Sequence, residues 1–191
     1  MKMISNMPEK KRGFESMEKL LTPEKTEKLS TRPGTGTAGP WKSLHIRAAK
    51  LADVESMVEL LRVLFALEPD FAFNPDKQRQ GLVKLICREQ GKCVLVAEFG
   101  ERLAGMCTAQ TVISTAEGGP VGWVEDVVVA PEYRGQGVGR LLLLTLESWA
   151  VSEGLKRLQL LADTDNGLAK KFYDRQGWRP TRLAALRKRL P

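Results

Sequence analysis

The chain has 191 residues, a formal net charge of +7, 42% hydrophobic residues and 28% charged residues. This composition is typical of a globular protein, because disordered chains contain fewer apolar residues, and the length predicts one compact folded domain. No apolar run approaches the ~20 residues of a membrane span, and no secretory signal pattern opens the chain. We therefore expect a cytoplasmic protein that does not bind membranes.

The excess positive charge lies at the two ends of the chain. Residues 1–43 carry a net charge of +4 and residues 179–191 carry +5, whereas residues 44–178 carry −2. A protein that binds duplex nucleic acid is expected to have a basic stripe on its folded surface. The charge pattern therefore argues against nucleic acid as the partner.

Residues 1–43 are predicted to form a flexible N-terminal extension. Residues 30–40, with the sequence STRPGTGTAGP, are rich in Gly, Pro and Thr, which is typical of a linker. Before this linker, four apolar residues at helical spacing predict a short helix: Phe14, Met17, Leu20 and Leu21. Such a short helix is not stable in isolation, so the folded domain is predicted to comprise residues 44–191.

Regular hydrophobic patterns begin at Leu44 and continue almost to the end of the chain. We expect strands at 44–47, 93–99, 103–115, 121–130, 157–162 and 183–189, and helices at 54–67, 77–89, 137–152 and 167–176. Asp53 is the expected N-cap of the first of these helices.

The order of these elements is β-α-α-β-β-β-α-β-α-β. It predicts an α/β (α+β) fold with a mixed, mostly antiparallel sheet that contains a central parallel strand pair. Three consecutive strands argue against a doubly wound nucleotide-binding fold, which needs strict alternation of strands and helices.

A glycine-rich segment, PEYRGQGVGR, occupies residues 131–140 between a predicted strand and a predicted helix. A helix N-terminus exposes N–H groups and carries a partial positive charge, and glycine allows its backbone to approach a phosphate. Arg134 adds a charged hydrogen-bond donor. The spacing is neither a Rossmann fingerprint nor a Walker A loop. The alternative is a turn that binds no ligand.

Three motifs occur in order around this segment. Arg134-x-x-Gly137-x-Gly139 follows the strand VEDVVVAP at 124–131, and Asn166 lies seven residues before Tyr173 in FYDRQGW. In this order and spacing they resemble the signature R/Q-x-x-G-x-G/A, the preceding strand and the FYxxxGF element of the GNAT superfamily of N-acetyltransferases. The resemblance covers about residues 44–190 and implies a GNAT-like fold.

The resemblance implies transfer of an acetyl group from acetyl-CoA to a primary amine, by direct attack in a ternary complex and without a metal. It assigns acetyl-CoA binding to Val127, Val128, Val129, Arg134, Gly135, Gln136, Gly137, Val138, Gly139, Arg140 and Asn166. The valines also fit a buried parallel strand, and Asn166 also fits a helix N-cap. The alternative function is a non-catalytic, GNAT-like module that binds acyl-CoA or a partner.

Glu125 and Tyr173 are the catalytic residues that the resemblance implies. Glu125 matches the general base of some family members, and Tyr173 matches the general acid, whose phenol is neutral at pH 7. A solvated carboxylate and a core aromatic residue are the respective alternatives. Because successive strand residues point to opposite faces, Glu125 and Asp126 are expected to face opposite sides of the sheet. We interpret Asp126 as structural.

The sequence contains three cysteines, Cys87, Cys93 and Cys107, and a single histidine, His45. The odd number and the absence of a CxxC pair argue against disulfides and a structural zinc site. We interpret all three cysteines as buried apolar residues, because no histidine motif accompanies them as in a nucleophilic site.

The C-terminal end departs from the family pattern. Only 13 residues follow Trp178, whereas many family members have two further strands that help to close the acceptor pocket. We expect an acceptor side that is open or completed by a second subunit of a homodimer. By analogy, Phe71, Phe73 and the turn at 117–120 would line it. Glu68, Asp70 and Glu117 suit a cationic acceptor, but the sequence leaves open which small-molecule or peptide amine is used.

Overall fold

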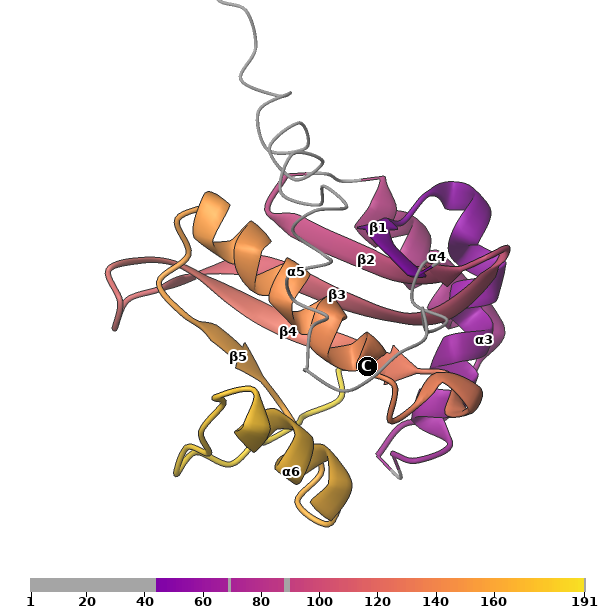
Figure 1. The fold of residues 1–191 in the computed structure, drawn as a ribbon. Helices are drawn as coiled ribbons and strands as arrows, with labels where there is room; N and C mark the ends of the chain where they lie inside the picture. Colours follow the sequence, from indigo (N-terminus) through magenta and orange to yellow (C-terminus); the bar gives the residue numbers. More distant parts are fainter. Residues whose placement is uncertain (1–43, 69, 88–89, 191) are drawn as a thin grey trace, which may run out of the picture.

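The computed structural model describes residues 44–68, 70–87 and 90–190. These residues form a five-stranded sheet with helices on both faces (Figure 1). The predicted extension, linker and short helix of residues 1–43 lie outside the described residues. Within the described part, no helix is long and apolar enough to cross a membrane.

The elements follow the predicted order from residue 44 to residue 175. They are β1 (Leu44–Ala48), η3 (Leu51–Asp53), α3 (Val54–Phe65), α4 (Pro75–Ile86), β2 (Lys92–Phe99), β3 (Arg102–Ser114), β4 (Gly119–Val129), η4 (Pro131–Tyr133), α5 (Val138–Ser152), β5 (Leu158–Leu160) and α6 (Gly167–Arg175). The mixed α/β architecture expected from the sequence is confirmed.

The strand order in the sheet is β1-β2-β3-β4-β5. The first four strands pair antiparallel with their neighbours, and β5 pairs in parallel with β4 after the crossover through α5. The parallel pair lies at one edge of this sheet and not at its centre as predicted, because residues 183–189 add no strand beyond β5.

Adjacent residues of the central strands are buried on opposite faces of the sheet. Leu95 and Cys107 belong to the core that includes α5. Val96 and Met106 belong to the core that includes α3 and α4. Burial on both faces explains why these strands are nearly continuous apolar runs in the sequence. Because both faces are covered, α5 and α3 lie on opposite sides of β4, the strand that contributes residues to the candidate site.

Helix α4 begins two residues before its predicted start. The side chain of Asn74 accepts a hydrogen bond from the backbone N–H of Lys77 at 3.1 Å, and Pro75 occupies the first turn. A proline tolerates this position because its missing N–H would have no helical partner there. Leu82 is the fully buried residue of this helix.

Asp53 does not cap α3 with its side chain, contrary to the prediction. Its Oδ2 atom accepts a hydrogen bond from the backbone N–H of Lys50 at 2.6 Å, and its carboxylate pairs with Arg47 at 2.7 Å. Arg47 also pairs with Glu98 at 2.8 Å. The carboxylate is therefore used to join β1, β2 and the start of α3, which the local cap pattern does not reveal.

The predicted last strand at 183–189 is wrong. Leu183, Leu186 and Leu190 are exposed, and their spacing of three and four residues would divide them between the two faces of a strand. The segment instead contacts the loop after α3. The guanidinium carbon of Arg187 lies 4.3 Å from the centroid of the Phe71 ring, and Nη1 of Arg187 donates a hydrogen bond to the Asp70 carbonyl at 3.1 Å.

The cysteines divide into two groups. Cys93 and Cys107 are buried, as predicted, but Cys87 is exposed at the end of α4. Burial raises the pKa of Cys93 to about 12 and raises the pKa of Cys107 well above its usual value. Both buried side chains are therefore protonated thiols at neutral pH and not nucleophiles.

Candidate active site

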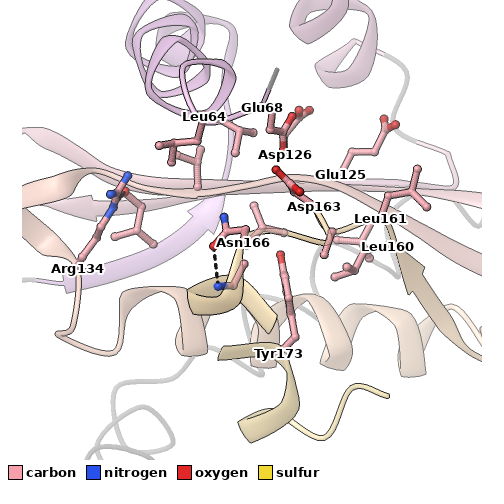
Figure 2. A pocket seen from close by; sticks show the side chains of 17 residues that line it. Leu64, Glu68, Glu125, Asp126, Arg134, Leu160, Leu161, Asp163, Asn166 and Tyr173 are labelled. Carbon is pink, nitrogen blue, oxygen red and sulfur yellow. Dashed lines mark hydrogen bonds between the residues drawn. The ribbon is translucent and has the colours of Figure 1, made fainter. Parts of the chain in front are cut away.

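A cavity of about 180 Å³ lies where the pairing of β4 with β5 ends (Figure 2). The paired residues run only from Gly122 with Leu158 to Val124 with Leu160. Beyond them, the β5 side of β4 has no partner strand in the part of the chain that the structure describes. The lining residues are Leu64, Leu67, Glu68, Val124, Glu125, Asp126, Val127, Val128, Val129, Arg134, Leu160, Leu161, Ala162, Asp163, Asn166, Ala169 and Tyr173.

A β-bulge in β4 brings Glu125 and Asp126 to the same cavity, which corrects the prediction that they face opposite sides. The register between β3 and β4 shifts between Met106 and Thr108, and Asp126 has a φ of 52°. Positive φ is uncommon for residues other than glycine, and bulges often re-aim side chains beside active sites. The bulge breaks the alternation on which the prediction rested.

Thr108 supports this bulge from β3. Its hydroxyl lies 3.1 Å from the Glu125 carbonyl oxygen and 3.2 Å from Oδ2 of Asp126, and it can donate to one of them at a time. Burial raises the pKa of Asp126 to about 6, with a further upward contribution from the nearby Glu125 carboxylate. The cavity therefore contains a carboxyl group that titrates close to neutral pH.

We expect Asp126→Asn to stabilise the protein at neutral pH. The raised pKa means that folded Asp126 retains a proton up to about pH 6, whereas an unfolded aspartate loses it near pH ~4. The free energy of unfolding of the wild-type protein therefore decreases as the pH rises from about 4 to about 6. Asparagine avoids this loss and tolerates positive φ. The expected gain is about 1–3 kcal/mol at neutral pH and none below about pH 4.

Thermal unfolding of Asp126→Asn and wild type across this pH range measures the difference directly. Glu101→Gln in the exposed turn between β2 and β3 is the control for removal of an acid, and it should follow wild type at every pH. A difference between Asp126→Asn and wild type that does not change with pH would contradict the raised pKa.

The glycine-rich loop ends at the N-terminus of α5. Gly137, the N-cap residue of α5, has a φ of 86° and no side chain with which to cap the helix, whereas Asn74 caps α4 and Asn166 caps α6. A Cβ atom at Gly137 would meet no atom within 4 Å. The open space beside an uncapped helix N-terminus fits an anionic group such as a diphosphate.

Gly139 has a different role from Gly137. A Cβ atom at Gly139 would lie 3.2 Å from Cζ of Phe172 and 3.5 Å from a methyl group of Val129. This glycine therefore permits the close packing of α5 against α6 and β4. Gly135, Gln136, Gly137, Val138, Gly139 and Arg140 do not line the cavity, whereas Val127, Val128, Val129, Arg134 and Asn166 do.

Arg134 and Asn166 reach the cavity from positions just before two different helices, α5 and α6. Nε of Arg134 donates a hydrogen bond to the carbonyl of Val129 at 3.0 Å, which fixes the arginine against the end of β4. Oδ1 of Asn166 accepts a hydrogen bond from the backbone N–H of Ala169 at 3.0 Å. The N-cap alternative for Asn166 is thus confirmed, and the same residue also lines the cavity.

The two predicted catalytic residues meet at this cavity. Tyr173 extends from α6 with its hydroxyl directed into the cavity (Figure 2), and its ring contacts Phe172 and Trp178 at centroid distances of 5.2 and 5.9 Å. Burial raises the pKa of Tyr173 to about 12. Glu125 is more exposed, and its Oε1 accepts a hydrogen bond from the indole N–H of Trp123 at 3.3 Å.

The expected acceptor-side residues are only partly found at the cavity. Glu68 lines it, but Phe71, Phe73 and the turn at 117–120 do not. Phe71 stacks on Phe65 with a centroid distance of 5.5 Å, and Phe73 lies under the guanidinium of Arg62. Sequence reasoning missed Asp163. Its position just after a strand that runs parallel to β4 was the available signal, because ligands bind beyond the carboxyl ends of such strands.

Comparison with known proteins places these features in a family. Residues 55–178 match the acetyltransferase (GNAT) family. The chain is 30% identical over 143 residues to a glucosamine 6-phosphate N-acetyltransferase from Trypanosoma brucei brucei, covering 71% of this chain and 89% of the relative. It is 33% identical over 79 residues to an aminoglycoside N(6')-acetyltransferase type 1 from Stenotrophomonas maltophilia, covering 41% and 47%.

Solved structures agree with this match. The fold superposes with a TM-score of 0.68 on a possible acetyltransferase from Clostridium difficile 630, at 17% identity and covering 78% of this chain and 98% of that chain. The resemblance inferred from the three motifs is therefore confirmed. The chain belongs to the acetyltransferase (GNAT) family.

Proposed function

We propose that the protein transfers an acetyl group from acetyl-CoA to a primary amine, by direct attack of the amine on the thioester in a ternary complex. The observation that supports this most strongly is the cavity where β4 and β5 stop pairing. It combines an unpaired edge of β4, the Tyr173 hydroxyl and several carboxylates, next to the uncapped N-terminus of α5.

Binding of acetyl-CoA is proposed to use mainly backbone groups. The N–H groups of the loop from Arg134 to Arg140 would hold the diphosphate, and Arg134 would add a charged donor. Main-chain groups of Val127 and Val129 would hold the pantetheine and the thioester. The cavity is smaller than the ~300–1,000 Å³ of common ligand pockets, so it would enclose the reacting groups and not the whole coenzyme.

Tyr173 is proposed to donate a hydrogen bond, and then its proton, to the departing sulfur. Its raised pKa keeps the phenol protonated at all physiological pH values. Glu125 is proposed to accept the proton that the acceptor ammonium must lose before or during attack. Acetyl-CoA supplies the activated acyl group, and preorganised donors on β4 would stabilise the charge that develops on its carbonyl oxygen.

A screen of primary amines with detection of free coenzyme A tests the proposed function. We expect acetyl-CoA to bind saturably in a calorimetric titration and at least one amine to be acetylated. Saturable binding without turnover of any amine would support the non-catalytic acyl-CoA-binding module instead. Absence of acetyl-CoA binding by the folded protein would overturn both alternatives.

We expect Glu125→Gln to lower kcat/KM at low pH by about 100-fold and to approach wild type as pH rises. The reason is that high pH supplies the amine already deprotonated, which makes the base unnecessary. Steady-state rates of coenzyme A release across the pH range check this, with Glu101→Gln as the control for an exposed acid. Equal activity of Glu125→Gln and wild type at all pH values would show that Glu125 is not the base.

A further inference from the structure

The candidate cavity is divided by charge. Arg134 stands at one side, and four carboxylates stand away from it: Glu68, Glu125, Asp126 and Asp163 (Figure 2). They come from the end of α3, from β4 and from the segment after β5. Segments that are far apart in the sequence therefore bring these acids together beside Tyr173.

These four carboxylates, which we call the acidic wall, have no cationic partner within residues 44–68, 70–87 and 90–190. The neutral donors to them are the Thr108 hydroxyl, the Trp123 indole N–H and the Asp165 backbone N–H. Two other pairs of carboxylates among the described residues are each bridged by an arginine. Arg47 lies between Asp53 and Glu98, and Arg79 lies between Glu55 and Asp76.

The negative charges of the acidic wall are therefore not balanced by a positive charge among the described residues. Burial raises the pKa of Glu68, and the charges of Asp163 and Asp70 raise it further. Glu125 and Glu68 act on Asp126 in the same direction. A cation in the cavity would relieve this repulsion. Among the described residues, no group of three or more His, Cys, Asp or Glu side chains is arranged to hold a metal ion. An organic cation with more than one ammonium group can donate hydrogen bonds to several of these carboxylates at once.

We propose that the acceptor is a small polycationic amine, such as a polyamine or an aminoglycoside, whose non-reacting ammonium groups bind Glu68, Asp126 and Asp163. This inference rests on the proposed acetyltransferase function. It selects between the chemistries of relatives: glucosamine 6-phosphate would place a phosphate near the acidic wall, whereas an aminoglycoside places further amino groups there. Like charges brought together in a partly buried site are strongly unfavourable.

Matched acceptors test the proposal. Butylamine, 1,4-diaminobutane and spermidine form a series of increasing charge, and glucosamine with glucosamine 6-phosphate isolates the effect of one phosphate. Sisomicin represents the aminoglycosides. We expect kcat/KM to be at least tenfold higher for spermidine or sisomicin than for butylamine or glucosamine 6-phosphate. Added salt should reduce this preference because it screens the attraction. Equal or better use of butylamine or glucosamine 6-phosphate would overturn the proposal.

Substitutions in the acidic wall separate recognition from folding. Asp163→Asn keeps an oxygen acceptor for the Asp165 N–H, and Glu68→Gln keeps the side-chain shape. Each variant should raise KM for the preferred polycation about fivefold or more, with little change in kcat and little change in KM for butylamine. Glu101→Gln should behave as wild type with both acceptors. An equal loss with both acceptors would indicate a structural role and would contradict the inference.

Failure of this inference and failure of the proposed function give different results. Turnover of amines without a preference for added positive charge overturns only the acceptor class. Absence of turnover with every amine, measured beside a calorimetric titration of acetyl-CoA, overturns the proposed function and with it the acceptor class.

Discussion

Tyr173→Phe is expected to reduce kcat about 100-fold, the low end of the range for general acid–base groups, while acetyl-CoA affinity stays nearly unchanged. The substitution keeps the ring against Phe172 and Trp178 and removes only the hydroxyl in the cavity. Two reasons place the effect at the low end. A thiolate is a good leaving group, and a phenol with a pKa of about 12 is a weaker acid than a thiol at ~8.5.

The matched control is Tyr133→Phe, because Tyr133 is the other of the two tyrosines in the chain. Its ring packs on Phe99 at a centroid distance of 5.5 Å and is partly buried against the core. Single-turnover rates of both variants, with the acceptor found in the screen, compare the chemical step directly. Full activity of Tyr173→Phe when chemistry limits the rate would show that Tyr173 is a packing residue.

Gly137→Val is expected to weaken acetyl-CoA binding at least tenfold, or about 1.4 kcal/mol. A branched side chain would stand in the open space beside the N-terminus of α5, where we propose that the diphosphate binds. The positive φ of Gly137 adds a backbone cost of roughly 1–2 kcal/mol for any L-residue. Calorimetric titration with acetyl-CoA measures the affinity, and thermal unfolding measures the backbone cost.

Gly154→Val separates these two effects. Gly154 has a φ of 69° and open space around it, like Gly137, but it lies after the other end of α5. It should lose similar stability without loss of affinity. Gly139→Val is not equivalent, because its side chain would clash with Phe172. Unchanged affinity in folded Gly137→Val would exclude this loop as the diphosphate site.

Sequence patterns predicted most of the fold because they report local preferences. The apolar runs of β2, β3 and β4 have the length and flanking turns of strands, and α3 and α5 have helical periodicity. The order of these elements was sufficient to predict a mixed sheet. Boundaries were less accurate where side-chain capping decided them, as at Asn74 and Pro75 in α4.

Motif resemblance identified the glycine-rich loop and Tyr173 as candidate site residues, because the motifs are defined by residue type and spacing. The resemblance could not determine which glycine borders open space and which glycine packs against another element. Gly137 and Gly139 occupy similar positions in the motif, but a Cβ atom at Gly139 would meet Phe172, a residue on another helix. That distinction depends on the packing of α5 against α6.

The sequence by itself determined the element order, the position of the loop before α5 and the identity of the family. Only the tertiary structure decided that Asp126 shares a cavity with Glu125, that residues 183–189 form no strand, and that Glu68 and Asp163 meet at the acidic wall. The physical reason is that periodicity and capping act within a few residues. The β3–β4 register, the end of the β4–β5 pairing and the separation of acids from arginines depend on contacts between distant segments.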